Sequence, residues 1–405
     1  MKPIVRAGRM KPVHSDIRGP LFVEAMKRQK QGIDILKLNT GNPATFGFGL
    51  PDSIKNALME HMQDGVGYCD FKGMPQARQA ICDYETSKGI KGITSDDVFI
   101  GNGVSEVVSF ALTPLLNDGD EVLVPSPSYS LWGNSVYLED GKPVFYTCDE
   151  QANWYPDIQD IRSKITDKTK AIVIINPNNP TGVLYPKELL LEIIQIARES
   201  GLLIFADEIY DRLVMDGKQH ISLASLTEDV PVITLNGLSK SHCLCGYRCG
   251  WMVISGPREL TEDYRQGIIQ LTSLRLCANT LAQIVIPAAL DDMDTPASMV
   301  RPGGRIYEQR EATVRELEKI DGLSFVKNDA AFYVFPKLDV KKFNITNDKQ
   351  FAHDLLDATN ILLVPGSGFD WKDPDHFRIV MLPQADILSD AIRRMGTFLD
   401  GYKQK

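Results

Sequence analysis

The chain has 405 residues, of which 43% are hydrophobic and 24% charged, and its formal net charge is −9. This length allows two domains with substantial cores, and the charged fraction is ordinary for a globular protein. The acidic balance argues against a nucleic-acid-binding protein, which normally carries a basic face, but leaves room for a local basic pocket.

Cysteine usage and hydropathy bear on the compartment. Seven cysteines in a long chain are an odd number, so a disulfide scaffold is not expected. A metal site at Cys243, Cys245 and Cys249 is disfavoured because their spacing matches no zinc pattern; small buried thiols are the alternative. Residues 1–4 hold no apolar signal core, and no run of about 18 apolar residues occurs. We expect a cytoplasmic protein without a membrane span or a bound metal.

The first 45 residues contain an expected helix near 19–32 and an apolar segment at 35–38. From about residue 50 to 300, short apolar segments alternate with helical spacing, as in the helix expected over 187–199. The expected strands lie at 98–100, 121–124, 171–175, 202–206, 232–235 and 250–254. All-apolar strands separated by helices indicate a mainly parallel sheet covered on both faces, in which ligands gather at the carboxyl ends of the strands.

After residue 300 the pattern changes to a smaller α+β arrangement. Helices are expected over 305–319, 349–359 and 386–402, and strands at 331–335, 361–364 and 377–380. The sequence therefore predicts an N-terminal segment (1–45) that joins a small C-terminal domain (301–405), and a large domain (46–300) between them.

The segment 237–250 is the most informative part of the chain. Lys240 follows the apolar run 232–235, and Arg248 comes eight residues later among small residues. A lysine at the end of a core strand can act as an amine nucleophile, and a nearby arginine can clamp a phosphate. Together they suggest pyridoxal phosphate (PLP); a surface lysine with an ion-paired arginine is the alternative.

Three residues follow other expected strands. Ser105 lies at the start of a helix, where free amides suit a phosphate, or it caps that helix. Asp207 ends a buried strand and needs a partner, which could be a pyridine nitrogen or the next helix's amides. Tyr210 could supply a phenol to a ring oxygen.

Further candidates lie at 126–129, 176–182 and 376–380. Asn179 lies in a loop dense in turn-forming residues and could hold a ring hydroxyl, or simply form a tight turn. Tyr129 could stack on an aromatic cofactor or pack in the core. Arg378 lies inside a strand-like run, where either a substrate carboxylate or an internal salt bridge would pair it.

These motifs, in this order, resemble the class I/II PLP-dependent aminotransferases of fold type I. The resemblance covers nearly the whole chain and rests on residues 237–250, 176–182, 207–210 and 377–378. Among the branches of the family, the chain is most similar to bacterial glutamate–pyruvate (alanine) aminotransferases, supported by 15–20 and 274–277.

The resemblance implies fold type I, PLP as cofactor and ping-pong transamination between L-alanine and 2-oxoglutarate, giving pyruvate and L-glutamate. Lys240 would form the aldimine with PLP and move the proton. Asp207 would pair with the pyridine nitrogen, Tyr210 and Asn179 would bond the ring oxygen, and Tyr129 would stack on the ring.

The resemblance also implies how the phosphate is held. Val104, Ser105 and Arg248 would bind it, and Tyr68 would reach it from the partner subunit of a homodimer. Many family members carry serine where this chain has Gly237, and Ser239 is a candidate replacement. The peptide bonds before Pro127 and Pro180 are expected to be cis.

Substrate recognition follows from the same resemblance. Gly41, Asn179 and Arg378 would hold the α-carboxylate, and Arg18 is the candidate for the distal carboxylate of glutamate, with a surface arginine as its alternative. An aminotransferase for aspartate, aromatic or branched-chain substrates, and a PLP β-lyase, share these cofactor residues and stay open. A non-catalytic regulator is disfavoured because no residues are left for a DNA-binding helix pair.

Overall fold

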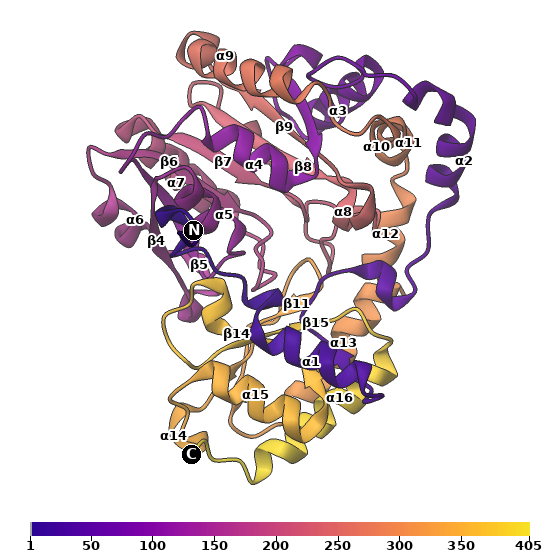
Figure 1. Cartoon of the computed structure of the whole chain (residues 1–405), viewed down its shortest axis with the longest axis vertical. Helices are drawn as coiled ribbons and strands as arrows, with labels where there is room; N and C mark the ends of the chain where they lie inside the picture. The colour runs from indigo at the N-terminus through magenta and orange to yellow at the C-terminus, as the bar shows by residue number, and fades with distance from the viewer. Residues whose placement is uncertain (1) are drawn as a thin grey trace.

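The computed structural model describes residues 2–405. A large α/β part lies above a smaller part in Figure 1, and the N-terminal segment crosses from one to the other. The largest element is an eight-stranded sheet with strand order β2-β9-β8-β7-β6-β3-β4-β5. Its strands are β2 (Val98–Asn102), β3 (Glu121–Ser126), β4 (Lys142–Asp149), β5 (Tyr155–Pro156), β6 (Thr169–Ile175), β7 (Leu203–Asp207), β8 (Val232–Gly237) and β9 (Cys249–Ser255).

The prediction of a mainly parallel sheet is confirmed. Strands β8, β7, β6, β3 and β4 run parallel, whereas β9 lies antiparallel between β2 and β8, and β5 is antiparallel to β4. Because β2 and β8 both oppose β9, they point the same way. The carboxyl ends of β2, β3, β6, β7 and β8 therefore share one edge of the sheet.

Helices cover both faces of this sheet, which is why its strands are mostly apolar. Along β6, Ala171, Val173 and Ile175 pack into one core cluster, and Ile172 and Ile174 pack into another on the opposite face. The helices of this part are α2 (Asp52–His61), α3 (Pro75–Ser87), α4 (Val104–Leu112), α5 (Leu131–Leu138), α6 (Ile158–Lys164), α7 (Lys187–Ser200), α8 (Leu238–Ser241), α9 (Arg258–Arg275), α10 (Thr280–Ile284), α11 (Ile286–Asp291) and α12 (Asp294–Val300).

The smaller part has three short sheets and its own core. Strand β1 of the N-terminal segment pairs in parallel with β13, and β15 lies between β11 and β14. Its elements are α1 (Pro20–Lys30), β1 (Leu36–Lys37), α13 (Arg305–Leu317), β10 (Leu323–Ser324), β11 (Tyr333–Val334), β12 (Lys337–Leu338), α14 (Val340–Phe343), α15 (Asp348–Thr359), β13 (Ile361–Leu362), β14 (Val364–Pro365), β15 (Phe377–Val380) and α16 (Ala385–Asp400).

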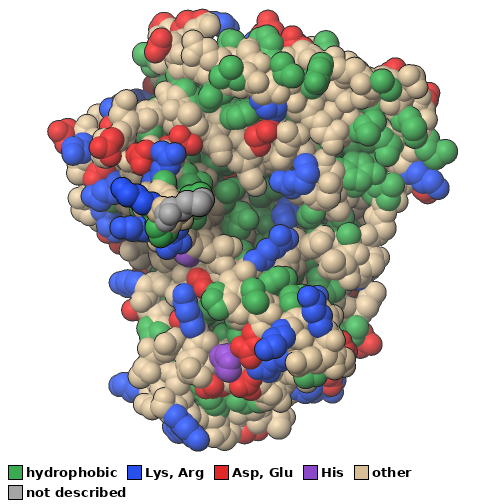
Figure 2. Space-filling model, viewed as in Figure 1, with side chains coloured by type: hydrophobic (Ala, Val, Ile, Leu, Met, Phe, Trp, Pro, Cys, Tyr) green, Lys and Arg blue, Asp and Glu red, His purple; other side chains and the backbone are tan. Residues whose placement is uncertain are grey.

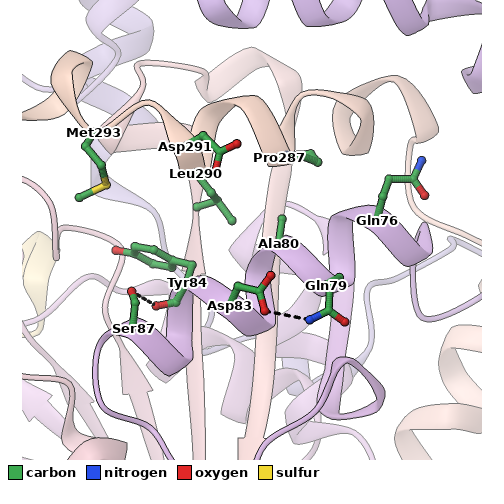
Figure 3. A pocket seen from close by; sticks show the side chains of 10 residues that line it. All are labelled: Gln76, Gln79, Ala80, Asp83, Tyr84, Ser87, Pro287, Leu290, Asp291 and Met293. Atoms are coloured by element: carbon green, nitrogen blue, oxygen red, sulfur yellow. Dashed lines mark hydrogen bonds between the residues drawn. The ribbon is translucent and has the colours of Figure 1, made fainter.

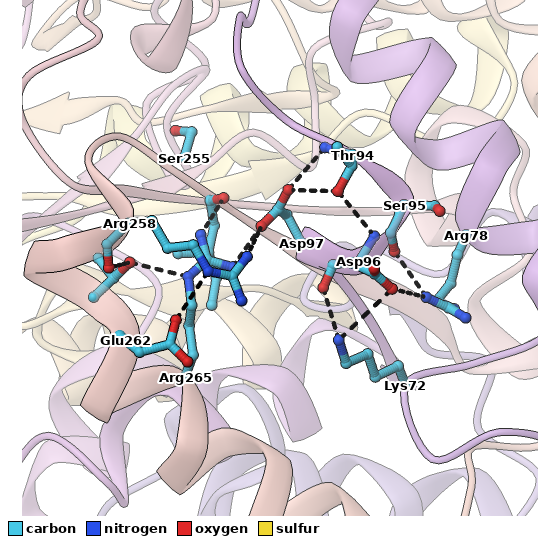
Figure 4. Close-up of polar contacts among 12 residues, drawn as sticks. Lys72, Arg78, Thr94, Ser95, Asp96, Asp97, Ser255, Arg258, Glu262 and Arg265 are labelled. Atoms are coloured by element: carbon cyan, nitrogen blue, oxygen red, sulfur yellow. Dashed lines mark hydrogen bonds and ion pairs between the residues drawn. The ribbon is translucent and has the colours of Figure 1, made fainter.

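A buried ion pair ties the start of β2 to α9 (Figure 4). Asp97 accepts a 2.6 Å bond from Nη1 of Arg265, which also donates to the carbonyl of Ile254 in β9 at 3.0 Å. Thr94 and Asp97 also form a capping box before β2. With both charges paired and bonded, the pair fixes α9 against the sheet edge.

One backbone expectation is confirmed and one is wrong. The Ser126–Pro127 bond is cis, as expected, but the second cis bond in residues 2–405 joins Asn176 to Pro177 and does not precede Pro180. The chain reverses as soon as β6 ends at Ile175, because Asn178 donates to Val183 O at 3.1 Å and closes the loop there.

No single helix within residues 2–405 is long and apolar enough to cross a membrane. Helix α9 taken together with the segment 280–291 passes a length and composition test as a pair bent by 119°.

Candidate active site

The shared carboxyl edge of the sheet brings the predicted site residues together. Ser105 lies in the first turn of α4 after β2, Tyr129 follows β3, Asn179 follows β6, Asp207 ends β7 and Lys240 lies in α8 after β8. In Figure 2, the face on view is hollowed between the large and small parts, with basic side chains along the hollow. This edge is where open α/β sheets bind ligands.

Lys240 is a partly buried amine without a carboxylate partner in the described chain. Its Nζ donates to the carbonyl of Gly41 at 2.9 Å and lies 3.9 Å from Sγ of Cys245. Burial acts to lower the pKa of Lys240, but nearby Tyr333, Cys245 and Tyr129 act more strongly in the other direction and raise it. The lysine therefore rests as an ammonium at the point where the N-terminal segment meets the sheet edge.

Asp207 is a buried carboxylate that no cationic side chain in residues 2–405 pairs with. Its Oδ2 accepts from Nε1 of Trp132 at 3.1 Å, and its Oδ1 accepts a longer 3.4 Å bond from Ile209 N. Burial raises the pKa of Asp207 to about 6, with the Trp132 bond opposing it. The expected alternative, a helix cap, is wrong because turns rather than a helix follow. A protonated ring nitrogen would relieve this cost.

Glu208 and Asp211, the acidic residues that follow Asp207, are both paired with Lys88. The ammonium of Lys88 lies 2.8 Å from Glu85, 2.7 Å from Glu208 and 3.2 Å from Asp211. Glu208, Asp211 and His220 also lie close enough together to bind a metal, but Lys88 already supplies the cation among them. This network anchors the segment that carries Asp207.

Arg378 is a fully buried guanidinium on β15. It donates from Nη1 to Oδ1 of Asn179 at 2.9 Å and from Nη2 to the carbonyl of Asn39. Its Nε has no hydrogen-bond partner, and no carboxylate in residues 2–405 pairs with it. The internal salt bridge considered from sequence is therefore wrong. Burial lowers the pKa of this arginine, and an entering carboxylate would compensate it.

The start of α4 lies beside the guanidinium of Arg248, an arrangement that suits an anion. Gly103 precedes the helix at φ 85°, and a Cβ there would lie 2.3 Å from Nη2 of Arg248. Arg248 has a left-handed backbone and is held by its 3.0 Å bond to Cys245 O. The amides at Val104 and Ser105 belong to an N-terminus with no side-chain cap. Ser105 is exposed and does not cap the helix, contrary to its alternative interpretation.

Close packing explains Gly237, where many family members have serine. A Cβ on Gly237 would lie 2.5 Å from the carbonyl of Cys249 in the neighbouring strand. Ser239, the candidate replacement, is buried, and its carbonyl accepts from Sγ of Cys245 at 3.0 Å. Its role toward a phosphate stays a prediction.

Sequence reasoning missed two aromatic residues of the site. Trp132 holds Asp207, and Tyr333 lies with its hydroxyl 2.8 Å from that of Tyr210. Trp132 lies three residues after Tyr129, in a segment for which no element was predicted, and Tyr333 lies in the segment 331–335, which was interpreted only as a strand. A buried tyrosine or tryptophan usually needs a hydrogen-bond partner for its O–H or N–H group. This requirement was the only feature by which the sequence could have pointed to Trp132 and Tyr333.

Two predicted residues lie outside this cluster. Tyr68 is 83% exposed. Arg18 is exposed at a separate surface cavity of about 380 Å³, whose wall includes Lys37 and the residues on either side of Gly41, Thr40 and Asn42. Arg18 therefore lies next to the loop that meets Lys240 but does not contact the cluster.

A second cavity of about 490 Å³ lies between α3 and α11 (Figure 3). Its polar lining includes Asp83, which accepts from Gln79 at 2.8 Å, and Asp291, but no basic side chain. It therefore does not suit a phosphate or a carboxylate.

Comparison with known proteins agrees with this geometry. The family described as "Aminotransferase class I and II" matches residues 33–392. The chain is 50% identical to glutamate-pyruvate aminotransferase AlaA of Haemophilus influenzae, with all of both chains covered. A crystal structure of an aminotransferase from Escherichia coli matches with TM-score 0.98 at 47% identity, with all of both chains covered. Alanine aminotransferase from Pyrococcus furiosus matches with TM-score 0.92 at 41% identity, covering 98% of this chain and 100% of that one.

The fold and the matched length define the class of protein. The chain belongs to the class I and II aminotransferases, and it is an aminotransferase enzyme.

Proposed function

We propose that the enzyme transfers an amino group between L-alanine and 2-oxoglutarate, giving pyruvate and L-glutamate, with PLP as cofactor. The names of the relatives support the substrates. The observation that carries the cofactor is that Asp207 and Lys240 at the edge of the large sheet, and Arg378, which reaches Asn179 from β15, have no counter-charge among residues 2–405. Isolated buried charges are costly, so a ligand is expected to complete them.

The residues present fit PLP. Val104, Ser105 and Arg248 would hold its phosphate at the free helix terminus, with Ser239 as a further candidate. Tyr129 would cover one ring face, Asp207 would pair with the ring nitrogen, and Tyr210 and Asn179 would bond the ring oxygen. Asn179 already accepts from Arg378, so its Nδ2 is left to donate. When bound, PLP supplies a carbonyl for the substrate amine and a protonated ring that withdraws electrons from the α-carbon.

The protein's own groups position the substrate and move its proton. Arg378, with Asn179 and the backbone at Gly41, binds the α-carboxylate through a fork of donors. When Lys240 is neutral and not bound to the cofactor, its Nζ takes the proton from the substrate α-carbon. In the half-reaction that runs in the reverse direction, the same atom returns a proton to the α-carbon. Gly41 O, which accepts from Lys240 in this structure at 2.9 Å, holds the amine beside the carboxylate site.

We also propose a homodimer in which Tyr68 reaches the phosphate of the partner subunit. Tyr68 is 83% exposed, and exposed apolar side chains Met62, Val66 and Leu281 lie on nearby segments. The exposed Tyr68 hydroxyl is therefore available to bind the phosphate in the partner subunit. Sedimentation should give twice the 45.1 kDa of one chain.

We keep two further expectations as proposals. The domain division at residues 45 and 300 is supported by the β1–β13 pairing, which attaches the N-terminal segment to the small sheets. A cytoplasmic location follows from the composition and from the class of enzyme.

The decisive experiment is a half-reaction screen. Each amino acid is added to the PLP-loaded enzyme, and loss of the visible absorption is followed. Alanine and glutamate should react fastest, and Lys240→Ala should abolish the reaction with both. A faster response to aspartate, tyrosine or leucine would overturn the substrate proposal but leave the class of enzyme intact.

Arg18 is tested separately because it lies in its own cavity. Arg18→Ala should raise KM for glutamate and 2-oxoglutarate far more than KM for alanine and pyruvate, since only the first pair has a distal carboxylate. Equal changes for all four substrates would contradict this role.

A further inference from the structure

Tyr333 lies where three residues of the proposed site meet. Its hydroxyl is 2.8 Å from the hydroxyl of Tyr210, and the two rings meet edge to face at 5.6 Å. The guanidinium carbon of Arg378 lies 4.5 Å from the centre of the Tyr333 ring. A Cβ on Gly41 would lie 2.2 Å from the Tyr333 hydroxyl, so that hydroxyl already fills the space beside Gly41.

The backbone holds Tyr333 rigidly in this place. It pairs with Val380 across the β11–β15 ladder, one strand from Arg378. Ala331 N donates to Leu213 O at 2.8 Å and Met381 N to Phe332 O at 2.9 Å. These bonds tie the Tyr333 segment to the small sheet and to the loop after Tyr210. The ring is 2% exposed, so its position is fixed by packing on every side.

The direction of the Tyr210–Tyr333 bond follows from counting hydrogens. Each phenol has one O–H to donate and lone pairs to accept. If Tyr210 donates to a ligand oxygen, its own oxygen must accept from Tyr333, so Tyr333 is the donor of the pair. Hydrogen bonds in such a chain polarise one another, which strengthens the outer bond by about 10–30%.

We propose that Tyr333 is a positioning residue for the transamination. Its hydroxyl donates to Tyr210 and so directs the Tyr210 O–H to the ring oxygen of the cofactor, while its ring holds the Arg378 guanidinium flat for the substrate carboxylate. The proposal rests on the proposed function, because the ring oxygen belongs to PLP and the carboxylate to an amino acid.

The hydroxyl is tested with Tyr333→Phe, which keeps the ring. The readout is the pH midpoint of the visible absorption of the PLP-loaded enzyme. When the anionic ring oxygen loses a hydrogen-bond donor, a neighbouring proton stabilises it more strongly. That proton is then lost at a higher pH, so the pH midpoint of the absorption should rise. We expect about 1 pH unit for Tyr210→Phe and about 0.3 unit for Tyr333→Phe. Tyr307→Phe is the matched control, since that ring lies on Arg310 in the same part of the chain.

A double variant tests whether Tyr333 acts through Tyr210. In the Tyr210→Phe background, Tyr333→Phe should add no further shift, because the outer bond is already gone. The ring is tested with Tyr333→Leu, which should raise KM for alanine about tenfold while Tyr333→Phe leaves it unchanged. If Tyr333 were purely structural, its substitution would change the melting temperature. It would change neither the pH midpoint of the absorption nor the difference in KM between Tyr333→Leu and Tyr333→Phe.

The outcomes separate the two proposals. If the unmodified enzyme binds PLP and transaminates, a Tyr333→Phe midpoint within 0.1 unit of the parent overturns the role of Tyr333, as does a shift that persists in the Tyr210→Phe background. If the unmodified enzyme takes up no PLP or transfers no amino group, the proposed function fails and the role of Tyr333 fails with it.

Discussion

Asp207 costs the enzyme stability whenever its cofactor is absent, and this cost is measurable. The carboxylate is buried at the end of β7, and its pKa is raised to about 6 by burial. An acid whose pKa is raised in the folded state penalises folding as it ionises. Asp207→Asn removes the charge but keeps an oxygen for the Trp132 indole, so we expect the cofactor-free variant to be more stable than the parent.

The size of the effect follows from the shift. From the ordinary value of 3.8 to about 6 is roughly 2.2 units, and at 1.36 kcal/mol per unit this is about 3 kcal/mol. Losing the long bond from Ile209 returns about 1 kcal/mol, leaving roughly 2 kcal/mol. A cooperative unit of about 250 residues gains roughly 2–4 °C per kcal/mol, so the melting temperature should rise by about 4–8 °C.

The sign changes with pH and with the cofactor. Below about pH 4 the aspartate is protonated in both states, so only the lost Ile209 bond remains and the variant should be about 1 kcal/mol less stable than the parent. The relief of the buried charge grows from pH 4 to 6 and is complete above pH 6. Calorimetry of cofactor-free protein at pH 4 and pH 8 measures it, with exposed Asp167→Asn as the control. PLP should stabilise the parent more than the variant, because only the parent offers the ring nitrogen a carboxylate. A variant that melts below the parent at pH 8 without PLP would refute the reasoning.

Three other variants test separate parts of the site. Arg378→Lys should lower kcat/KM for alanine about a hundredfold, because one ammonium cannot reproduce the guanidinium fork; a loss under fivefold would contradict a direct grip. Gly103→Ala should weaken PLP binding about tenfold in an absorbance titration, since its Cβ displaces the Arg248 guanidinium; unchanged affinity would exclude phosphate binding at Arg248. Lys88→Met should destabilise the enzyme by about 3–5 kcal/mol. The control is Lys91→Met, which should not change the melting curve because the Lys91 side chain is 70% exposed. Equal melting temperatures for the two variants would show that the buried network is not charged.

The sequence predicted six of the eight strands of the large sheet, because these strands are buried on both faces. Strands β4 and β5 were not predicted, and β4 is only partly buried. Strands β6 and β7 are continuous apolar runs ending at Asn176 and Asp207, and such runs between helices indicate a covered parallel sheet. The direction of β9 could not be predicted, because a buried strand carries the same residues whichever way it runs. The second cis bond was expected before Pro180 because of the family resemblance, but it precedes Pro177, directly after β6.

The candidate residues that ended strands were the ones the sequence could find. Lys240 and Asp207 follow apolar runs, so their positions at the sheet edge could be predicted from topology alone. Trp132 and Tyr333 could not, because an aromatic residue in a helix or strand usually packs in the core. Their polar atoms acquire meaning only when Asp207 and Tyr210 lie beside them in three dimensions.

The segment 207–211 shows how the chain distinguishes a ligand site from its own framework. Glu208 and Asp211 are buried, and Lys88 on another element supplies their cation. Asp207 is buried at the adjacent position, yet among residues 2–405 it receives only the neutral donors of Trp132 and Ile209. A chain that can place a lysine among three carboxylates one residue away could have neutralised Asp207 as well. Leaving it without a cation lowers the stability of the empty protein and reserves its charge for a ligand, which is why the missing counter-charge locates the active site more sharply than any single motif.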